Sequence, residues 1–185
     1  PQWVVTAAHC TDGLTAARID VAAGKTDLRK LTPADHYDVD RIAQYPFYNA
    51  RAWGHDIALL HLARPVPPSI LPPQRAVQRG PRQAYVRSAW VSGWGATASA
   101  PNGSDVLLTG HVSTTSPAEC RRQGAPWGTI CGTLPFSNQP AACWGDSGGP
   151  LESNGLLIGV VLGIVLQPSV PLALQPYLPI AVIAA

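Results

Sequence analysis

Residues 63–73 are the feature of this sequence that most restricts its fold, because five of these eleven residues are prolines. Proline has no backbone N–H and a fixed φ, so a segment this rich in proline forms neither a helix nor a central strand. The sequence A-R-P-V-P-P-S-I-L-P-P therefore predicts a stiff, extended connector. We expect two separate parts, at residues 1–62 and 84–185, with the connector reaching from residue 63 to 83.

Both parts consist of short apolar runs that end at polar, glycine or proline residues. The chain has 17 glycines and 19 prolines among 185 residues, and this spacing of turn residues favours many short strands over long helices. Both parts are therefore expected to be all-β. The predicted strands lie at residues 3–5, 17–23, 37–43 and 57–62 in the first part and at residues 84–91, 106–113, 129–133 and 156–166 in the second.

The composition is that of a compact globular protein, with 46% hydrophobic and 13% charged residues. A net charge of +2 is too small to indicate a nucleic-acid partner. No charged residue comes after Glu152, but the apolar run at residues 155–166 is shorter than the roughly 20 residues of a membrane span, and prolines interrupt the chain beyond residue 166. We expect buried strands there and no membrane span.

A serine framed by glycines, in Gly145-Asp146-Ser147-Gly148-Gly149-Pro150, is the strongest local indication of chemistry. Glycine tolerates the backbone conformations of a tight turn, so such a serine can expose its hydroxyl beside converging N–H groups. Donors arranged in this way stabilise the oxyanion of acyl transfer. A bare G-x-S-x-G is equally compatible with an ordinary glycine-rich turn, so the motif needs a base and an acid elsewhere in the chain.

The order of residues along the chain separates two kinds of serine hydrolase. In α/β-hydrolases the acid and the histidine come after the serine, whereas no histidine or aspartate comes after Ser147. Among upstream histidines, His9 stands out because it ends an apolar run and precedes Cys10. Asp56 directly precedes an apolar run, where a desolvated carboxylate suits the orientation of an imidazole. The histidines expected to be ordinary surface or core residues are His36, His55, His61 and His111.

Three blocks of the sequence resemble the signature motifs of the chymotrypsin/trypsin family of serine peptidases. They are Thr6-Ala7-Ala8-His9-Cys10, Asp56-Ile57-Ala58-Leu59-Leu60 and residues 145–150, in the family's order and at similar spacing. Tyr45-Pro46-Phe47-Tyr48-Asn49 and Val91-Ser92-Gly93-Trp94-Gly95 add to the resemblance, which extends to about residue 162. Three blocks in register are a highly specific signal.

The resemblance implies two antiparallel six-stranded β-barrels, the first incomplete in this chain, with the active site between them. It implies Ser147 as nucleophile, His9 as base and Asp56 as the residue that orients the base. The N–H groups of Gly145 and Ser147 would form the oxyanion hole, and Asp146 would bind the N-terminal ammonium that zymogen cleavage frees. We expect no cofactor and no metal ion.

The specificity pocket departs from the family pattern. Ala141, with Ala142 next to it, stands where trypsins have an aspartate that binds Arg or Lys, so a basic side chain would be buried there without a partner. The family's substrate-pairing Ser-Trp-Gly strand is also altered, at residues 162–164. We therefore expect cleavage after small or medium apolar residues. The expected pocket residues are Ala141, Ala142, Trp144, Leu162, Gly163 and Ile164.

Four cysteines without a C-x-x-C pair leave buried thiols and disulfides equally open on composition alone. By the resemblance, Cys120 and Cys131 match a family disulfide that closes a short loop. The family's partners of Cys10 and Cys143 are absent from the sequence, so we expect these two to be free thiols.

The sequence thus predicts a secreted serine endopeptidase, a monomer that acts on proteins or peptides and is open to protein inhibitors. The alternative is a non-catalytic homologue that binds partners through the same scaffold, which the altered substrate strand favours. The sequence begins at Pro1 and contains no methionine, so we expect it to lack the start of the translated chain. Because Pro1 lies on the strand that leads to His9, its ammonium is expected not to reach Asp146, and residues 1–185 alone are expected not to be a competent protease.

Overall fold

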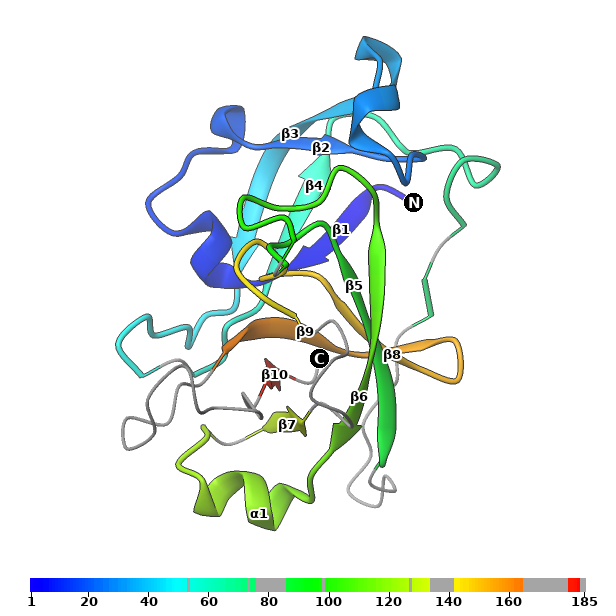
Figure 1. The fold of residues 1–185 in the computed structure, drawn as a ribbon. Helices are drawn as coiled ribbons and strands as arrows, with labels where there is room; N and C mark the ends of the chain where they lie inside the picture. Colours follow the sequence, from blue (N-terminus) through cyan, green and yellow to red (C-terminus); the bar gives the residue numbers. More distant parts are fainter. Residues whose placement is uncertain are drawn as a thin grey trace.

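The computed structural model describes residues 1–52, 54–72, 74–75, 86–97, 99–126, 128–133, 142–164 and 180–183. Within these residues the chain is mostly β and forms two antiparallel sheets. Figure 1 shows them beside each other, the first in blue and cyan and the second in green, yellow, orange and red. The all-β class and the division into two sheets are therefore as predicted.

The first sheet has four strands in the order β1-β4-β3-β2. Alternate side chains of β3 and β4 turn inward, as the two-residue period of a strand requires, and bury Tyr37, Val39, Leu60 and Leu62 in one apolar core. The strands are β1 (Trp3–Thr6), β2 (Asp20–Ala22), β3 (His36–Gln44) and β4 (Ala58–Leu62). In the described residues this sheet is open, in keeping with the prediction of an incomplete first barrel.

The second sheet is a closed barrel of six strands in the order β10-β7-β6-β5-β8-β9, so the prediction of a six-stranded barrel is confirmed. Its core includes Val91, Val112, Leu151 and Val161, each at most 4% exposed. The strands are β5 (Ser88–Gly93), β6 (Leu108–Thr114), β7 (Thr129–Thr133), β8 (Pro150–Ser153), β9 (Leu156–Ile164) and β10 (Ile180–Ile183).

Several local predictions were wrong. Residues 17–23 are not one strand, because Ala16–Arg18 form a 3-10 turn closed by the Ile19 N–H on the Ala16 carbonyl, and only β2 is extended. Strands β8 and β10 and the helix α1 (Pro117–Arg122) were not predicted. Parts of two predicted strands, residues 84–85 and 165–166, lie outside the described residues. Further 3-10 turns lie at Ala8–Thr11, Leu28–Lys30 and Pro33–Asp35.

The described part of the connector contains neither helix nor strand, as its prolines predict. Its path is not extended throughout, because the Ile70 N–H donates to the Pro67 carbonyl at 2.9 Å and closes a turn. The Val66 N–H donates to the Pro1 carbonyl at 2.8 Å and so ties the connector to the start of the chain. The proposed division at residues 62 and 84 remains a prediction.

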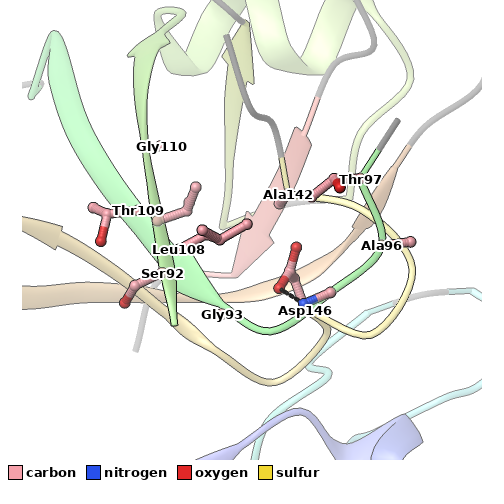
Figure 2. A pocket seen from close by; sticks show the side chains of 11 residues that line it. Ser92, Gly93, Ala96, Thr97, Leu108, Thr109, Gly110, Ala142 and Asp146 are labelled. Atoms are coloured by element: carbon pink, nitrogen blue, oxygen red, sulfur yellow. Dashed lines mark hydrogen bonds between the residues drawn. The ribbon is translucent and has the colours of Figure 1, made fainter. Parts of the chain in front are cut away.

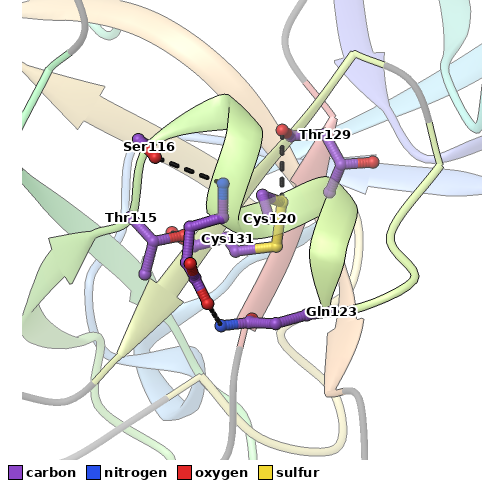
Figure 3. Close-up of a disulfide and its surroundings, with 7 residues drawn as sticks. Thr115, Ser116, Cys120, Gln123, Thr129 and Cys131 are labelled. Atoms are coloured by element: carbon purple, nitrogen blue, oxygen red, sulfur yellow. Dashed lines mark hydrogen bonds between the residues drawn. A yellow bond between two sulfur atoms is a disulfide. The ribbon is translucent and has the colours of Figure 1, made fainter.

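A disulfide between Cys120 and Cys131 joins α1 to β7, as Figure 3 shows. Both cysteines are buried, at 1% and 3% exposed. Ser116 caps the helix at its N-terminal end, and its hydroxyl accepts a hydrogen bond from the Glu119 N–H at 3.2 Å. Among the described cysteines, Cys10 and Cys143 are free thiols.

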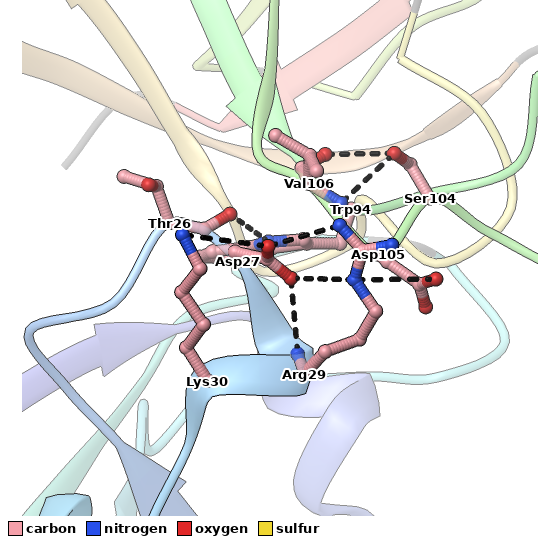
Figure 4. Close-up of polar contacts among 8 residues, drawn as sticks. All are labelled: Thr26, Asp27, Arg29, Lys30, Trp94, Ser104, Asp105 and Val106. Atoms are coloured by element: carbon pink, nitrogen blue, oxygen red, sulfur yellow. Dashed lines mark hydrogen bonds and ion pairs between the residues drawn. The ribbon is translucent and has the colours of Figure 1, made fainter.

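The two sheets also meet through a loop–loop contact, which we call the inter-sheet contact (residues 26–29, 94 and 104–107; Figure 4). The Leu28 N–H donates to the Asp105 carbonyl at 2.8 Å, and the Leu107 N–H donates to the Thr26 carbonyl at 2.7 Å. The indole N–H of Trp94 reaches the same Thr26 carbonyl at 3.1 Å. This contact fixes the segment that carries Trp94 against the first sheet.

Candidate active site

Strand pairing in the first sheet brings His9 and Asp56 together. Thr6, at the end of β1, pairs with Ala58, at the start of β4. In an antiparallel pair the residues beyond such a position lie side by side, so the turn after β1 meets the segment before β4. We call the 3-10 turn Ala8–Thr11 the His9 turn. The predicted base and its predicted partner are thus adjacent although 47 residues separate them.

Asp56 binds His9 through both carboxylate oxygens. Oδ1 accepts the His9 backbone N–H at 2.7 Å, and Oδ2 lies 2.5 Å from His9 Nδ1. Asp56 is only 1% exposed, so these hydrogen bonds take the place of the contacts with water that its carboxylate has lost. An ionised carboxylate can only accept, which assigns the proton of this bond to Nδ1 of His9. The other ring nitrogen, Nε2, therefore faces away from Asp56.

The environment raises the pKa of His9 from 6.5 to about 10. The hydrogen bond to Asp56 is the largest cause, with the contact to Cys10 second, while partial burial acts in the opposite direction. Both larger effects favour the imidazolium over the neutral ring. The site therefore stabilises the positive charge that a histidine base acquires when it takes a proton.

Residues 143–149, which we call the Ser147 loop, pack against the His9 turn. Gly145 and Gly148 have φ values of +95° and +83°, a region that favours glycine. A Cβ at Gly148 would lie 2.3 Å from Thr6 Oγ1 and 3.4 Å from Cys10 Sγ, so no larger residue fits between loop and turn. The Gly148 N–H also donates to the Val161 carbonyl at 2.8 Å, which anchors the loop to β9.

The sulfur of Cys10 contacts both halves of the site. It lies 3.5 Å from His9 Nε2 and 3.6 Å from the Ser147 carbonyl oxygen. Cys10 therefore connects the Nε2 end of the imidazole to the backbone of the Ser147 loop. The sequence predicted Cys10 as the neighbour of His9 and as a free thiol, but it did not predict this contact, since the contact depends on the path of a distant loop.

Two N–H groups of the Ser147 loop are available to a ligand. Among the described residues, the N–H groups of Gly145 and Ser147 donate to no acceptor, whereas the Asp146 N–H between them is bonded to the Cys143 carbonyl at 3.0 Å. The loop can thus offer two donors to an oxyanion beside Ser147. These are the two groups predicted for that role.

The side chain of Asp146 points toward the segment that follows β5 in the second barrel (Figure 2). Its Oδ1 accepts the Gly95 N–H and its Oδ2 accepts the Cys143 N–H, both at 2.8 Å. A Cβ at Gly95 would lie within 2.6 Å of the carboxylate, which explains the glycine at that position. No cation of the described residues lies within ion-pair distance of Asp146. The carboxylate lines a cavity together with Thr97, Leu108 and Ala142.

The residues predicted for the specificity pocket lie in different environments. Ala142 is 3% exposed and lines the cavity beside Asp146, and Leu162 is 4% exposed within β9. Trp144 is 81% exposed, while its carbonyl accepts the Ala96 N–H at 2.7 Å. Gly163 pairs with Ala181 of β10, and Ile164 is the last residue of β9. Ala141 lies outside the described residues.

The other four histidines have surface partners of their own. His55 stacks on Tyr45 with ring centroids 5.1 Å apart. The remaining partners are Asp20 for His36, Asp40 for His61 and Ser88 for His111. The described residues contain no group of three or more metal-ligating side chains. They also contain no helix long and apolar enough to cross a membrane.

Comparison with known proteins gives a consistent result. A family model described as Trypsin matches residues 1–183. A trypsin of Saccharopolyspora erythraea is 32% identical over 163 residues, covering 86% of this chain and 70% of that protein. A trypsin of Simulium vittatum is 31% identical and human kallikrein-15 is 32% identical, each over 87% of this chain and 66% of the relative. The chain thus spans about two thirds of the length of these relatives, and it belongs to the trypsin family.

Proposed function

We propose that the protein is a serine endopeptidase in which Ser147, His9 and Asp56 act as a triad. The observation that carries the proposal is the bond between His9 Nδ1 and the buried Asp56, 2.5 Å long, with Cys10 Sγ in contact with both His9 Nε2 and the Ser147 carbonyl. Membership of the trypsin family supports peptide bonds as the substrate. A histidine oriented by a buried carboxylate is what proton transfer from a serine hydroxyl requires.

In the proposed reaction Ser147 Oγ attacks the carbonyl carbon of the scissile peptide while His9 Nε2 accepts the hydroxyl proton. Asp56 stabilises the resulting imidazolium, in line with the raised pKa of His9. The carbonyl electrons move to oxygen, and the N–H groups of Gly145 and Ser147 donate to that oxyanion. His9 then gives its proton to the leaving amine as the C–N bond breaks. Water cleaves the acyl-enzyme by the same steps, with His9 again as base.

Asp146 is proposed to bind an N-terminal ammonium after zymogen cleavage. Its half-buried carboxylate has two N–H donors but no described cation, and it faces a cavity with room beside it (Figure 2). A carboxylate removed from water in this way favours a positive partner. The ammonium would hold the Ser147 loop in the conformation that presents its two free N–H groups.

The proposed substrates have a small or medium apolar residue before the scissile bond. Ala142 offers no charge to a basic side chain, and the exposed indole of Trp144 lies directly before the oxyanion glycine. Secretion is proposed because the Cys120–Cys131 disulfide is of a kind that persists in oxidising compartments. Action as a monomer and inhibition by proteins that occupy the site remain part of the proposal.

Substitution of Ser147 tests the proposal. In protein expressed from its complete gene and processed, we expect Ser147→Ala to lower kcat on apolar peptide substrates on the order of 10⁴-fold or more, because the proton-relay unit is lost. Ser153→Ala is the matched control, since Ser153 Oγ donates only to the Ser88 carbonyl at 3.0 Å, and its kcat should match wild type. Wild-type rates in Ser147→Ala would overturn the triad. A wild type that folds but cleaves nothing would support the non-catalytic alternative instead.

A further inference from the structure

The His9 turn is weakly held by its own backbone. Its Ncap residue, Ala7, makes no side-chain capping bond. Its two closing hydrogen bonds are long, at 3.3 Å from the Cys10 N–H to the Ala7 carbonyl and 3.4 Å from the Asp12 N–H to the His9 carbonyl. Hydrogen-bond geometry is poorer in a 3-10 turn than in an α-helix, so a single turn with such bonds is a weak support for a side chain. The orientation of His9 therefore needs support from outside the turn.

Gln44 and Thr11 supply that support through a closed ring of hydrogen bonds. The hydroxyl of Thr11, which is 3% exposed, donates to the Ala8 carbonyl at 2.8 Å. The amide nitrogen of Gln44 donates to the Thr11 hydroxyl at 2.9 Å and to the same Ala8 carbonyl at 3.3 Å. Both ends of the His9 turn are thereby connected to one side chain from another element.

Gln44 also connects the His9 turn to the segment that carries Asp56. Gln44 is the last residue of β3 and pairs with Ala58 of β4, two residues after Asp56. The next residue, Tyr45, donates its N–H to the Ile57 carbonyl at 3.0 Å. The pairing of β3 with β4 thus holds Gln44 close to the segment that carries Asp56. The Gln44 side chain then fixes the distance between these paired strands and the His9 turn.

We propose that Gln44 and Thr11 are positioning residues that align His9 with Asp56, an inference that rests on the proposed peptidase function. Neither touches substrate in this proposal. They act through the His9 turn, so that the two bonds from His9 to Asp56 form together. Loss of their bonds lets the turn rotate, which separates the imidazole from the carboxylate and from Ser147.

The test compares two glutamines that make the same kind of bond in the same sheet. Gln44→Leu removes both donors to the His9 turn. Gln2→Leu is the matched control, because Gln2 Nε2 donates to the Leu62 carbonyl at 2.9 Å within the sheet. Two readouts are used: kcat and KM on an apolar peptide, and the downfield NMR resonance of the His9 Nδ1 proton, assigned by its disappearance in His9→Ala.

We expect Gln44→Leu to lower kcat about tenfold at unchanged KM and to broaden or shift the His9 resonance. Gln2→Leu should change neither readout, even if it lowers the melting temperature as much as Gln44→Leu does. Thr11→Val should resemble Gln44→Leu, whereas Thr11→Ser should behave as wild type because it keeps the hydroxyl. An unaltered His9 resonance in both Gln44→Leu and Thr11→Val, or the same change in Gln2→Leu, would overturn the proposal.

The resonance of the His9 Nδ1 proton allows the positioning role of Gln44 and Thr11 to be tested separately from the proposed peptidase function. If wild type lacks peptidase activity, the function fails, and the His9 proton still reports whether Gln44 and Thr11 align His9. If wild type is active and the variants keep both the resonance and kcat, the function stands and the positioning role fails.

Discussion

Asp56 is the residue on which the geometry of the site depends most. A carboxylate that is 1% exposed has lost nearly all contact with water and has to be compensated by donors in the protein. Here one residue, His9, supplies a backbone and a ring donor at 2.7 and 2.5 Å. Removing the His9 ring leaves the buried Asp56 without its ring donor, and removing Asp56 leaves His9 without the acceptor that orients it, so the two are expected to act as a unit.

The first prediction concerns the charge of His9. Asp56 raises the pKa of His9 because the carboxylate stabilises the imidazolium, and Asp56→Asn replaces that carboxylate by a neutral amide. We expect the pKa of His9 to fall from about 10 toward its ordinary value of 6.5. A base must be neutral, so the rising limb of kcat/KM should move to lower pH, with a lower maximum because the amide favours the wrong tautomer.

NMR titration of His9 in wild type and Asp56→Asn measures this shift. Asp105→Asn, at an exposed carboxylate of the inter-sheet contact, is the control and should leave the His9 titration unchanged. A His9 pKa that stays the same or rises in Asp56→Asn would mean that Asp56 does not stabilise the imidazolium.

At the residue scale the sequence indicated the candidate residues but not their surroundings. His9, Asp56 and Ser147 each lie in a local motif whose residue types suit the proposed chemistry, and the order and spacing of the three motifs together made them candidates. The contact of Cys10 Sγ with His9 Nε2 and the bonds of Gln44 to the His9 turn join residues from different elements. They depend on rotamers and on strand register, which no local pattern encodes.

Among the elements, α1 and its disulfide illustrate what a local signal can and cannot give. Ser116, Pro117 and Glu119 form an N-terminal capping pattern that could have predicted the helix. Strand β8 has a local signal as well, because Asn154-Gly155, which joins it to β9, is the pattern of a two-residue hairpin turn and both residues have positive φ. Only its pairing with β5 joins segments that are far apart in the chain, and no local pattern encodes that pairing.

The second prediction concerns the disulfide. Cys120 and Cys131 are 11 residues apart, and closing a loop of that length restricts the unfolded chain. We expect the double variant Cys120→Ala/Cys131→Ala to lose about 3 kcal/mol of unfolding free energy, measured by urea denaturation. Cys10→Ala is the control for removal of a thiol and should lose far less. A double variant as stable as wild type would show that the bond does not constrain the unfolded state.

For the whole molecule, the site depends on the way the two sheets meet. His9 and Asp56 belong to the first sheet, whereas the Ser147 loop belongs to the barrel. The inter-sheet contact fixes Trp94, and the next residue, Gly95, donates to Asp146 beside Ser147. The division into two sheets was predictable from the proline-rich connector and from the resemblance. The pairing of residues 26–28 with 105–107 could not be predicted, because both are irregular loops whose bonds form only after the sheets have packed.

The third prediction tests the role of Asp146 in that arrangement. Asp146→Asn keeps the shape but sets an amide N–H₂ against the Gly95 or Cys143 N–H and removes the negative charge. The Ser147 loop should lose the conformation that presents the Gly145 and Ser147 N–H groups. We expect kcat/KM to fall on the order of 10²-fold or more, the loss seen when oxyanion donors are removed. Asp105→Asn should retain wild-type kcat/KM, and the same value in Asp146→Asn would remove Asp146 from the proposed mechanism.

The measurement that tests the central claim most directly is the site at which an organophosphonate with a small apolar side chain modifies the processed protein. We expect one adduct per molecule, located by mass spectrometry on Ser147, formed faster than with a phosphonate that carries a lysine-like side chain. Ser147→Ala should take up no label, and His9→Ala should react far more slowly because its serine lacks a base. A folded, processed protein that stays unlabelled at Ser147, or that is labelled at another residue, would contradict the assignment of Ser147 as the nucleophile.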